Sequence, residues 1–491
     1  MASSMNTDLG NSEHSRQHDY STWDKQVALL RELCRTSPAR VVRILTSVTK
    51  PAEDDTGDLK LYARTVLVVA EFSKAGRAQP EKREIWRKLV DAGVVDALIS
   101  VVIHSKHHLV TEGRLQRPEE HDPKDFQFVI SPYSHAVHIM SYAAGLLAPR
   151  DTEWAPTAQD RSFISSLRAH WSDMVKRIWD EPFDSLNPDN VHAIERVAFA
   201  SLFSRIIYVD PSVLNIAFND MTIPLVTRLW ASSGQQDAQG TTITLWTLFS
   251  DEIYPVTAKI NKYIQEHKNS FPRSKLFSHM CLGASSMPGT TEVNQARALA
   301  DVFGKRLEVM NSYVDLVLRM AQSLIAVREE GLNDQTREVF LDALVRSDMF
   351  WKGLFNLLNR AQKGEVTYNV KPIEENILVL RPILILAESC TGVEGQARGR
   401  LLVTLVKNGL WDTLDEILKD ILTHKDSKQL DICSHLTQSF IAMRCKILGY
   451  CGPECQKMDW KEHKPLCKMK GCMNTIAWEV QSLLHAQIRR D

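Results

Sequence analysis

The sequence has few cysteines outside one short stretch near its end. Nine cysteines occur in 491 residues, and six of them fall between Cys433 and Cys472. The other three, Cys34, Cys281 and Cys390, are too sparse to form a disulfide framework. We therefore expect reduced thiols and an intracellular setting, and the cysteines that gather near the end need a different explanation.

The sequence also shows no signal-peptide pattern in its first residues, no membrane-spanning run and no large net charge. Residues 1–17 are polar, so we expect a disordered tail over residues 1–22 instead of a signal peptide. The longest apolar run, 377–387, is interrupted by Arg381-Pro382 and is shorter than the roughly 18 residues that a membrane span needs. A formal net charge of −1 gives no general field for nucleic acid or an acidic membrane. These observations predict a soluble protein of the nucleus or cytoplasm that binds neither nucleic acid nor a membrane.

No common enzyme motif occurs in the sequence. Glycine-rich phosphate loops, the Gly-x-Ser-x-Gly turn and the His-Glu-x-x-His metal motif are all absent. Histidines gather in two places, in or beside polar stretches where solvated surface histidines are expected: His104, His107, His108, His135 and His138. We therefore expect that the protein is not an enzyme. The alternative is a cryptic site in the helical part, which a deep pocket with converging acid and base groups would reveal.

Helix signals dominate the chain. Ser37-Pro38 provides an N-cap and a first helical residue before apolar residues at helical spacing over 41–48. Strand signals are weak, because alternating runs are few and Asp-Gly is absent. The one Asn-Gly pair, Asn408-Gly409, follows a helical pattern and suits a helix end. The sequence predicts a mainly α fold.

Some of the expected helices are joined in a similar way. Residues 89–99 recur in outline at 405–415 and more loosely at 344–358: a helix ends near a glycine, the chain turns, and a new helix begins. This junction is similar to those of armadillo and HEAT-like repeats, so we expect residues 23–430 to form an armadillo-like helical array. A non-repeating helical array is the alternative. Residues 51–58 predict a loop between helices.

Near the end of the chain, thiol and imidazole side chains are spaced as metal ligands. Cys451 and Cys455 are four residues apart, so a helix between them would place both sulfurs on one face. His463 and Cys467 repeat this spacing. Zinc prefers these ligands, and such a density in a short stretch is rarely accidental. The sequence predicts a zinc site formed from Cys433, Cys445, Cys451, Cys455, His463 and Cys467.

The segment resembles a MYND-type zinc finger, most closely in its second half. There the family has a cysteine, then Tyr-Cys, a cysteine followed by glutamine, a tryptophan, and a final histidine and cysteine. These positions are filled here by Cys445, Tyr450, Cys451, Cys455, Gln456, Trp460, His463 and Cys467. The resemblance implies a small zinc-binding module over residues 431–472, behind the helical body and followed by a helix over residues 473–491. This arrangement is similar to that of many fungal proteins.

The resemblance also implies how zinc is held, but the first half of the motif departs from the family pattern. The implied ligand sets are interleaved, with Cys445, His463 and Cys467 on one ion and Cys451 and Cys455 on the other. Cys433 or His435 could complete the second set, and Cys472 could be a fourth ligand for either ion. The cysteine expected three residues before Cys445 is Ala442, and the residue three after Cys433 is Leu436. We therefore expect one zinc ion or two in a finger with a degenerate first half. The alternative for Cys433 is a buried position on a helix over 430–448.

The function that the resemblance implies is protein interaction. MYND fingers bind short proline-containing peptides in a groove, and the matching groove positions here are Gln456 and Trp460. The small core of the finger is the other role open to Trp460. The Asn-His-Ser-Cys and Gly-Glu-Glu-Leu segments of SET methyltransferases, which can accompany such fingers, are absent. We therefore expect an adaptor that recruits protein partners, for example in transcriptional regulation. A vestigial finger that caps the helical scaffold is the alternative.

Overall fold

The computed structural model describes most of the helical part of the chain. The described residues are 13–49, 56–76, 78–105, 109–111, 114–116, 129–147, 157–180, 193–249, 258–287, 294–325, 334–363, 365–366, 404 and 408–409. They are mainly α-helical, with three short strands, which confirms the predicted fold class. The chain divides into two compact units, Met1–Phe271 with Ser286–Pro288, and Pro272–Ser285 with Gly289–Asp491.

The helices of the first unit follow one another in a repeating order of three. The first set comprises α1 (Glu13–Thr36), α4 (Pro80–Asp91), α7 (Ala158–Ala169), α10 (Val213–Ala217) and α13 (Ala258–Glu266). The second set comprises α2 (Pro38–Thr46), α5 (Val94–His104), α8 (Trp171–Trp179) and α11 (Thr222–Ser232). The third set comprises α3 (Thr56–Ser73), α6 (Pro132–Leu147), α9 (Ala193–Val209) and α12 (Gln235–Phe249).

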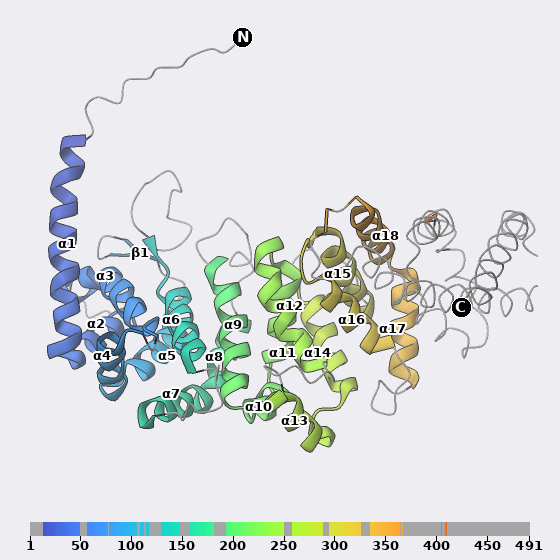
Figure 1. Ribbon diagram of the computed structural model, residues 1–491, viewed down its shortest axis with the longest axis horizontal. Coiled ribbons are helices and arrows are strands. Elements are labelled where there is room, and N and C mark those ends of the chain that lie inside the picture. The colour runs from blue at the N-terminus through green and yellow to red at the C-terminus, as the bar shows by residue number, and fades with distance from the viewer. Residues whose placement is uncertain are drawn as a thin grey trace, which may run out of the picture. The chain divides into compact units, whose positions relative to one another are not determined.

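The second and third sets form rows, because helices three places apart in the chain contact one another. In the third set, α3, α6, α9 and α12 lie side by side in this order (Figure 1). In the second set, α2, α5, α8 and α11 contact one another in the same succession. This arrangement is compatible with the predicted armadillo-like array, since each helix group buries its apolar face against the next. The connections between helices vary in length, so no regular period is visible in the sequence.

The second unit is built around α15 (Gln295–Val309). This helix contacts α14 (Arg273–Ser285), α16 (Val314–Ile325), α17 (Asp334–Arg346) and α18 (Asp348–Gln362). Its largest contact is with α18, where two glycines face each other. A Cβ on Gly304 would overlap the backbone carbonyl of Met349, and a Cβ on Gly353 would overlap the carbonyl of Gly304. The absence of both side chains lets the two helix backbones touch.

Local signals for helix ends are confirmed at several places. α2 begins at Pro38, directly after Ser37, which occupies the N-cap position but makes no side-chain hydrogen bond to the helix. Gly93 joins α4 to α5 with a φ of 92°, a left-handed conformation that glycine adopts without steric cost. Gly409 also has a positive φ, of 70°, directly after Asn408. Both glycines therefore mark turns of the kind that the sequence predicted.

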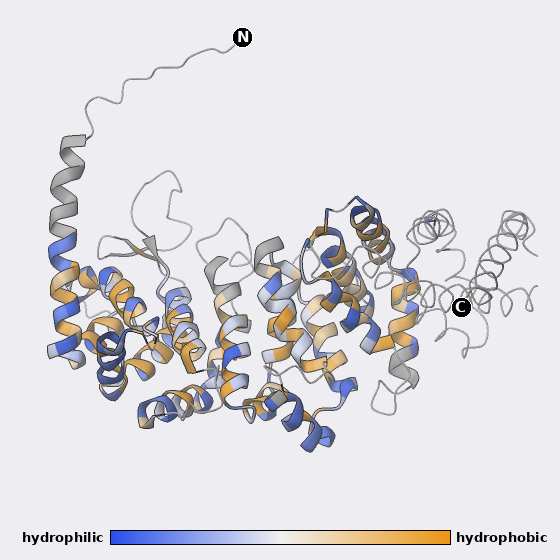
Figure 2. Cartoon of the chain, viewed as in Figure 1, coloured by the Kyte–Doolittle hydropathy of each residue, from blue (hydrophilic) through white to orange (hydrophobic). Residues whose placement is uncertain are grey.

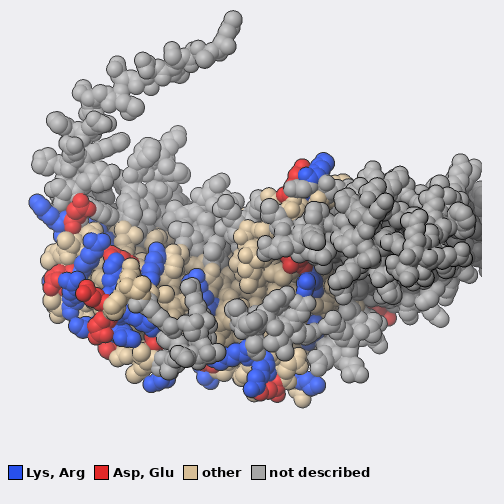
Figure 3. Space-filling view, viewed as in Figure 1, with Lys and Arg blue, Asp and Glu red and all other residues tan. Residues whose placement is uncertain are grey.

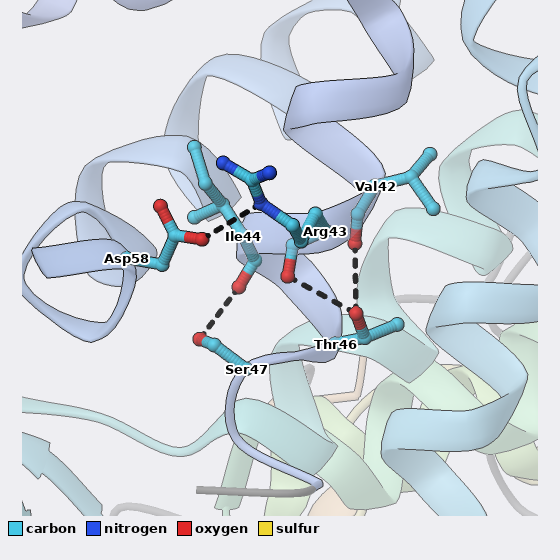
Figure 4. Close-up of polar contacts among 6 residues, drawn as sticks. All are labelled: Val42, Arg43, Ile44, Thr46, Ser47 and Asp58. Carbon is cyan, nitrogen blue, oxygen red and sulfur yellow. Dashed lines mark hydrogen bonds and ion pairs between the residues drawn. The ribbon is translucent and has the colours of Figure 1, made fainter. Parts of the chain in front are cut away.

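Side chains close the end of α2 and join it to α3 (Figure 4). The hydroxyls of Thr46 and Ser47 donate to carbonyls of the last turn at 2.7 to 3.2 Å. Arg43 Nε donates to Asp58 Oδ2 at 3.0 Å. Asp58 lies in the first turn of α3, which begins at Thr56, so the predicted loop ends earlier than residue 58. An acidic side chain is favourable there, because the helix N-terminus carries partial positive charge.

The first helix begins earlier than predicted. α1 begins at Glu13, so the tail predicted for residues 1–22 is too long. The prediction was based on the polar composition of this segment, but glutamate, arginine and glutamine are also good helix formers. Further along α1, Leu30 and Cys34 are buried and provide the apolar contacts that a helix in water needs.

A small antiparallel sheet lies between α5 and α6, where no strand was predicted. β1 (Leu109–Thr111) lies between β2 (Arg114–Gln116) and β3 (Val129–Ile130). Val110 is fully buried and pairs with Leu115 on one side and Ile130 on the other. Strands of two or three residues are too short to show the alternation from which a strand is recognised. The sheet contacts α3.

The core of the first unit is rich in aromatic side chains. Trp171 of α8 is fully buried, stacks on Phe199 with ring centroids 5.6 Å apart, and donates to Thr222 Oγ1 at 2.8 Å. Trp230 of α11 donates to Thr242 Oγ1 at 2.9 Å. Each indole is thus buried with its N–H bonded, which avoids the cost of an unsatisfied donor. Hydrophobic and hydrophilic residues occur together on most helices (Figure 2), as expected of helices that bury one face.

Candidate functional site

The predicted zinc ligands lie outside the described residues. They are Cys433, Cys445, Cys451, Cys455, His463 and Cys467. The predicted peptide-binding residues, Gln456 and Trp460, lie there too, as do the boundaries at residues 431 and 472. Their roles therefore stay predictions. The donor set itself fits zinc, because thiolate and imidazole are the protein ligands that this ion prefers.

The described part of the chain contains no second candidate for a metal centre. Within it, no three His, Cys, Asp or Glu side chains are grouped so that they could hold an ion. Its two cysteines, Cys34 and Cys281, are buried thiols. Burial, with a smaller contribution from Glu71, raises the pKa of Cys34 to about 12, and burial also raises the pKa of Cys281. Such thiols are poor zinc ligands and poor nucleophiles, since both roles need the thiolate.

Two open grooves mark the surface of the first unit. One, of about 530 Å³, lies between α7 and the end of α9, where Arg168 pairs with Asp210 at 3.6 Å. The other, of about 400 Å³, lies at the ends of α5 and α8, where Arg177 Nη2 donates to the carbonyl of Ser105 at 2.9 Å. In each groove the contact joins one helix to the end of another. Both contacts therefore have a structural role in helix packing.

One side of α6 brings together side chains from α6 itself, from α9 and from the residue that follows α3. His138 and Tyr142 lie one turn apart on α6, with ring centroids 4.2 Å apart in a T-shaped arrangement. Lys74 follows α3 and places its Nζ 4.1 Å from the centroid of the Tyr142 ring. Arg205 of α9 donates from Nη1 to the carbonyl and the hydroxyl of Ser141, at 2.5 and 3.0 Å. We call Lys74, His138, Tyr142 and Arg205 the α6 cluster.

The prediction of solvated surface histidines holds for only part of the group. His104 is exposed at the end of α5, whereas His135 and His138 of α6 are partly buried. His107 and His108 lie outside the described residues. Burial lowers the pKa of His135. Burial first, and then the positive charges around it, lower the pKa of His138 to about 4.

Because of His138, we expect the folded protein to lose stability in mild acid. His138 has a folded-state pKa of about 4, below its ordinary value of 6.5. Between these two pH values the unfolded chain binds a proton that the folded chain does not, so stability falls as pH falls from 6.5 towards 4. Lys74, His135 and Arg205 are the charged and titratable groups that contribute to this depression. Replacement of His138 by Phe keeps a ring against Tyr142 and removes the proton site, so the melting temperature should depend less on pH.

The unmodified protein and His138→Phe are compared by thermal unfolding at about pH 7 and about pH 5, on either side of the ordinary pKa of histidine. His104→Gln is the matched control, because it removes an exposed histidine from α5. We expect the control to lose as much stability between the two pH values as the unmodified protein. An equal loss in His138→Phe would show that other groups cause the acid sensitivity.

The α6 cluster was not predicted from the sequence, because its members come from different helices. Only His138 and Tyr142 share a helix, at a spacing of four residues that places both on one face. Lys74 and Arg205 reach this face only because α3 and α9 pack on either side of α6. The spacing of four residues between the rings of His138 and Tyr142 was the one sign of this cluster in the sequence.

Comparison with known families identifies the segment near the end of the chain. The family model of the MYND finger matches residues 432–467. This range contains the six predicted ligands, and the match confirms the resemblance. The chain therefore carries a MYND finger behind its helical body. Such fingers bind zinc and act as protein-interaction modules.

No curated protein matches the chain. In the part of the chain that the structure describes, the helices are too short or too polar to cross a membrane.

Proposed function

We propose that this protein is an intracellular adaptor whose helical body presents a zinc-bound MYND finger to protein partners. The observation that carries the proposal is the family match at residues 432–467, in a chain whose described residues are mainly packed helices. Rows of helices provide a long, rigid surface, and the finger provides a local binding site. The proposed setting is the nucleus or cytoplasm, with transcriptional regulation as one process and with no enzymatic activity of its own.

The proposed ligands of the finger are proline-containing peptides. Trp460 would supply an apolar wall for a proline ring, because an indole offers a large flat surface. Gln456 would bond to the peptide backbone through its side-chain amide, which can both donate and accept. These two roles follow from the family resemblance at the matching positions.

The proposed role of zinc is structural. Cys445, His463 and Cys467 would hold one ion, and Cys451 and Cys455 would contribute to a second. Zinc binding supplies folding free energy to small domains of this kind, because they have too few apolar residues to fold alone. Ala442 and Leu436 stand where ligands are expected, so one ion per chain is as compatible with the proposal as two.

Zinc content per chain tests whether the finger works. Protein purified without added metal should contain about one to two zinc ions per chain by elemental analysis. Cys455→Ser and Cys445→Ser should each lower this content, because each removes a thiolate ligand. The control is Cys34→Ala, a buried cysteine of α1, which should leave the zinc content unchanged.

Zinc content and peptide binding, measured together, separate a working finger from a vestigial one. If zinc content is normal, Trp460→Ala should keep the metal and lose affinity for a proline-rich peptide library. Zinc far below one ion per chain, in protein with normal helical content, would contradict the proposal and assign the interaction role to the helical body. Loss of zinc with full retention of peptide binding would show that the peptides bind elsewhere.

A further inference from the structure

The α6 cluster gathers positive charge that no described carboxylate compensates. Lys74 is exposed and contacts the Tyr142 ring, and Arg205 bonds to Ser141. Among the described residues, neither cation has an Asp or Glu partner at ion-pair distance. His138 completes the group with a second ring against Tyr142. The cluster therefore presents cations whose contacts are an aromatic ring and uncharged oxygens.

The nearest acidic residue along α3 is already engaged in other pairs. Glu71 lies three residues before Lys74 and accepts from Arg31 of α1 at 3.0 Å. It also accepts from Lys82 of α4 at 2.7 Å. Its carboxylate is thus held by two other cations, so it does not neutralise the α6 cluster. The side chains of Lys74 and Arg205 keep their charge available to a partner.

The position of Arg205 is fixed by packing between α6 and α9. Its guanidinium lies against Gly145, where a Cβ would come within 2.9 Å of its atoms. Nη1 is committed to Ser141, while the other guanidinium nitrogens make no hydrogen bond among the described residues. The guanidinium is therefore held in place with donors to spare, which is the state in which Arg recognises a carboxylate most effectively.

Electrostatics at the neighbouring histidine point in the same direction. The pKa of His138 is lowered to about 4 by burial and then by Lys74, His135 and Arg205. The part of this shift that comes from the three positive groups reflects a positive field, which also attracts an anion. The field is local, because the whole chain has a formal net charge of −1. Elsewhere on the visible face of the N-terminal helices, basic and acidic side chains are intermixed (Figure 3).

The surroundings of the cluster suit a peptide better than a free ion or a nucleic acid. Leu67 of α3 is 38% exposed and lies about two turns before Lys74 on the same side of the helix, so an exposed apolar side chain lies about 10 Å from Lys74 along α3. Tyr142 adds an aromatic surface against which Lys74 lies. Nucleic acid binding usually rests on many phosphate contacts, whereas this face offers two strong cations. A peptide segment that alternates carboxylates with apolar side chains matches this combination of two cations with aromatic and apolar side chains.

We propose that the face formed by α3, α6 and α9 binds an acidic segment of a partner protein, whose carboxylates pair with Lys74 and Arg205 and whose apolar side chains contact Tyr142 and Leu67. This interaction is independent of the finger. In an adaptor, a second contact made by the same partner would raise its overall affinity, since the second binding event becomes intramolecular.

The test measures binding of a short labelled peptide of Asp, Glu and Leu to the full-length protein by fluorescence anisotropy. Lys74→Glu should weaken binding roughly tenfold or more, because it places a like charge opposite the carboxylates. Arg205→Gln, which keeps a donor for Ser141, should weaken it as well. Lys88→Glu is the matched control, since it makes the same charge reversal at an exposed position of α4 and should change affinity little.

The outcomes separate this proposal from its competitors and from the role of the finger. Cys455→Ser should bind the acidic peptide as well as the unmodified protein, whatever its zinc content. Equal weakening by Lys88→Glu and Lys74→Glu would overturn the proposal in favour of a general field. Tighter, Lys74-dependent binding of a single-stranded oligonucleotide would overturn it in favour of nucleic acid. Displacement of the peptide by inorganic phosphate at matched ionic strength would overturn it in favour of a simple anion site.

Discussion

Replacement of Gly304 by alanine is expected to destabilise the second unit by about 3 kcal/mol. The new Cβ would overlap the backbone carbonyl of Met349, and neither backbone can move without shifting a whole helix. Gly353→Ala should have a similar effect, because its Cβ would meet the carbonyl of Gly304. The intrinsic preference of alanine for helices, about 1 kcal/mol over glycine, acts in the opposite direction and is too small to compensate.

Hydrogen exchange resolved by segment is the suitable measurement, because it reports on α15 and α18 separately from the first unit. Gly240→Ala provides the matched control. Gly240 lies within α12, and a Cβ there would meet nothing within 4 Å. We expect this control to protect α12 slightly more than the unmodified chain. Unchanged exchange of α15 and α18 in Gly304→Ala would mean that the two helices are not in backbone contact.

Replacement of Arg228 by methionine is expected to cost roughly 3 kcal/mol. Arg228 of α11 is 5% exposed and closes the end of α8: Nη1 donates to the carbonyl of Trp179 at 2.8 Å, and Nη2 donates to that of Ile178 at 2.9 Å. Its guanidinium also lies 4.3 Å from the Trp179 ring centroid. Methionine would fill much of the space but would leave these bonds unmade and the helix end without its compensating charge.

Denaturant unfolding of the full-length chain, followed by circular dichroism, measures this loss. Arg35→Met is the control, because Arg35 is exposed on α1 and its one partner among the described residues is Glu32, in a 3.5 Å ion pair. Exposed pairs of this kind contribute less than about 1 kcal/mol. Arg228→Lys should recover part of the stability, since an ammonium group restores the charge but not both bonds. Equal effects of the Arg228 and Arg35 replacements would contradict a capping role.

The parts of the fold that depend on neighbouring residues could be predicted from the sequence. Ser37-Pro38 and the glycine at Gly93 marked helix ends correctly, because caps and turns are decided by local backbone preferences. The MYND finger was recognised for the same reason, since its ligands lie within one short segment. The beginning of α1 at Glu13 was missed because polar composition distinguishes poorly between a tail and a solvated helix.

Features that depend on packing could not be predicted. The contact between Gly304 and Gly353 joins two helices that are separated in the sequence, and nothing around either glycine indicates it. The α6 cluster likewise needs α3 and α9 beside α6 before Lys74 and Arg205 can meet Tyr142. The assignment of finger ligands to one ion or two also depends on tertiary structure, which the spacing of cysteines leaves open.

Capping arginines make the ends of α5, α8 and α15 dependent on helices that are synthesised later. Arg177 of α8 closes the end of α5, and Arg228 of α11 closes the end of α8. In the second unit, Arg360 of α18 donates to the carbonyl of Glu308 at the end of α15. As the chain emerges from the ribosome, each of these helix ends stays open until the later helix has been made. Completion of these three helix ends should therefore wait for the later helix, and a chain that stalls before that helix will present the end uncapped.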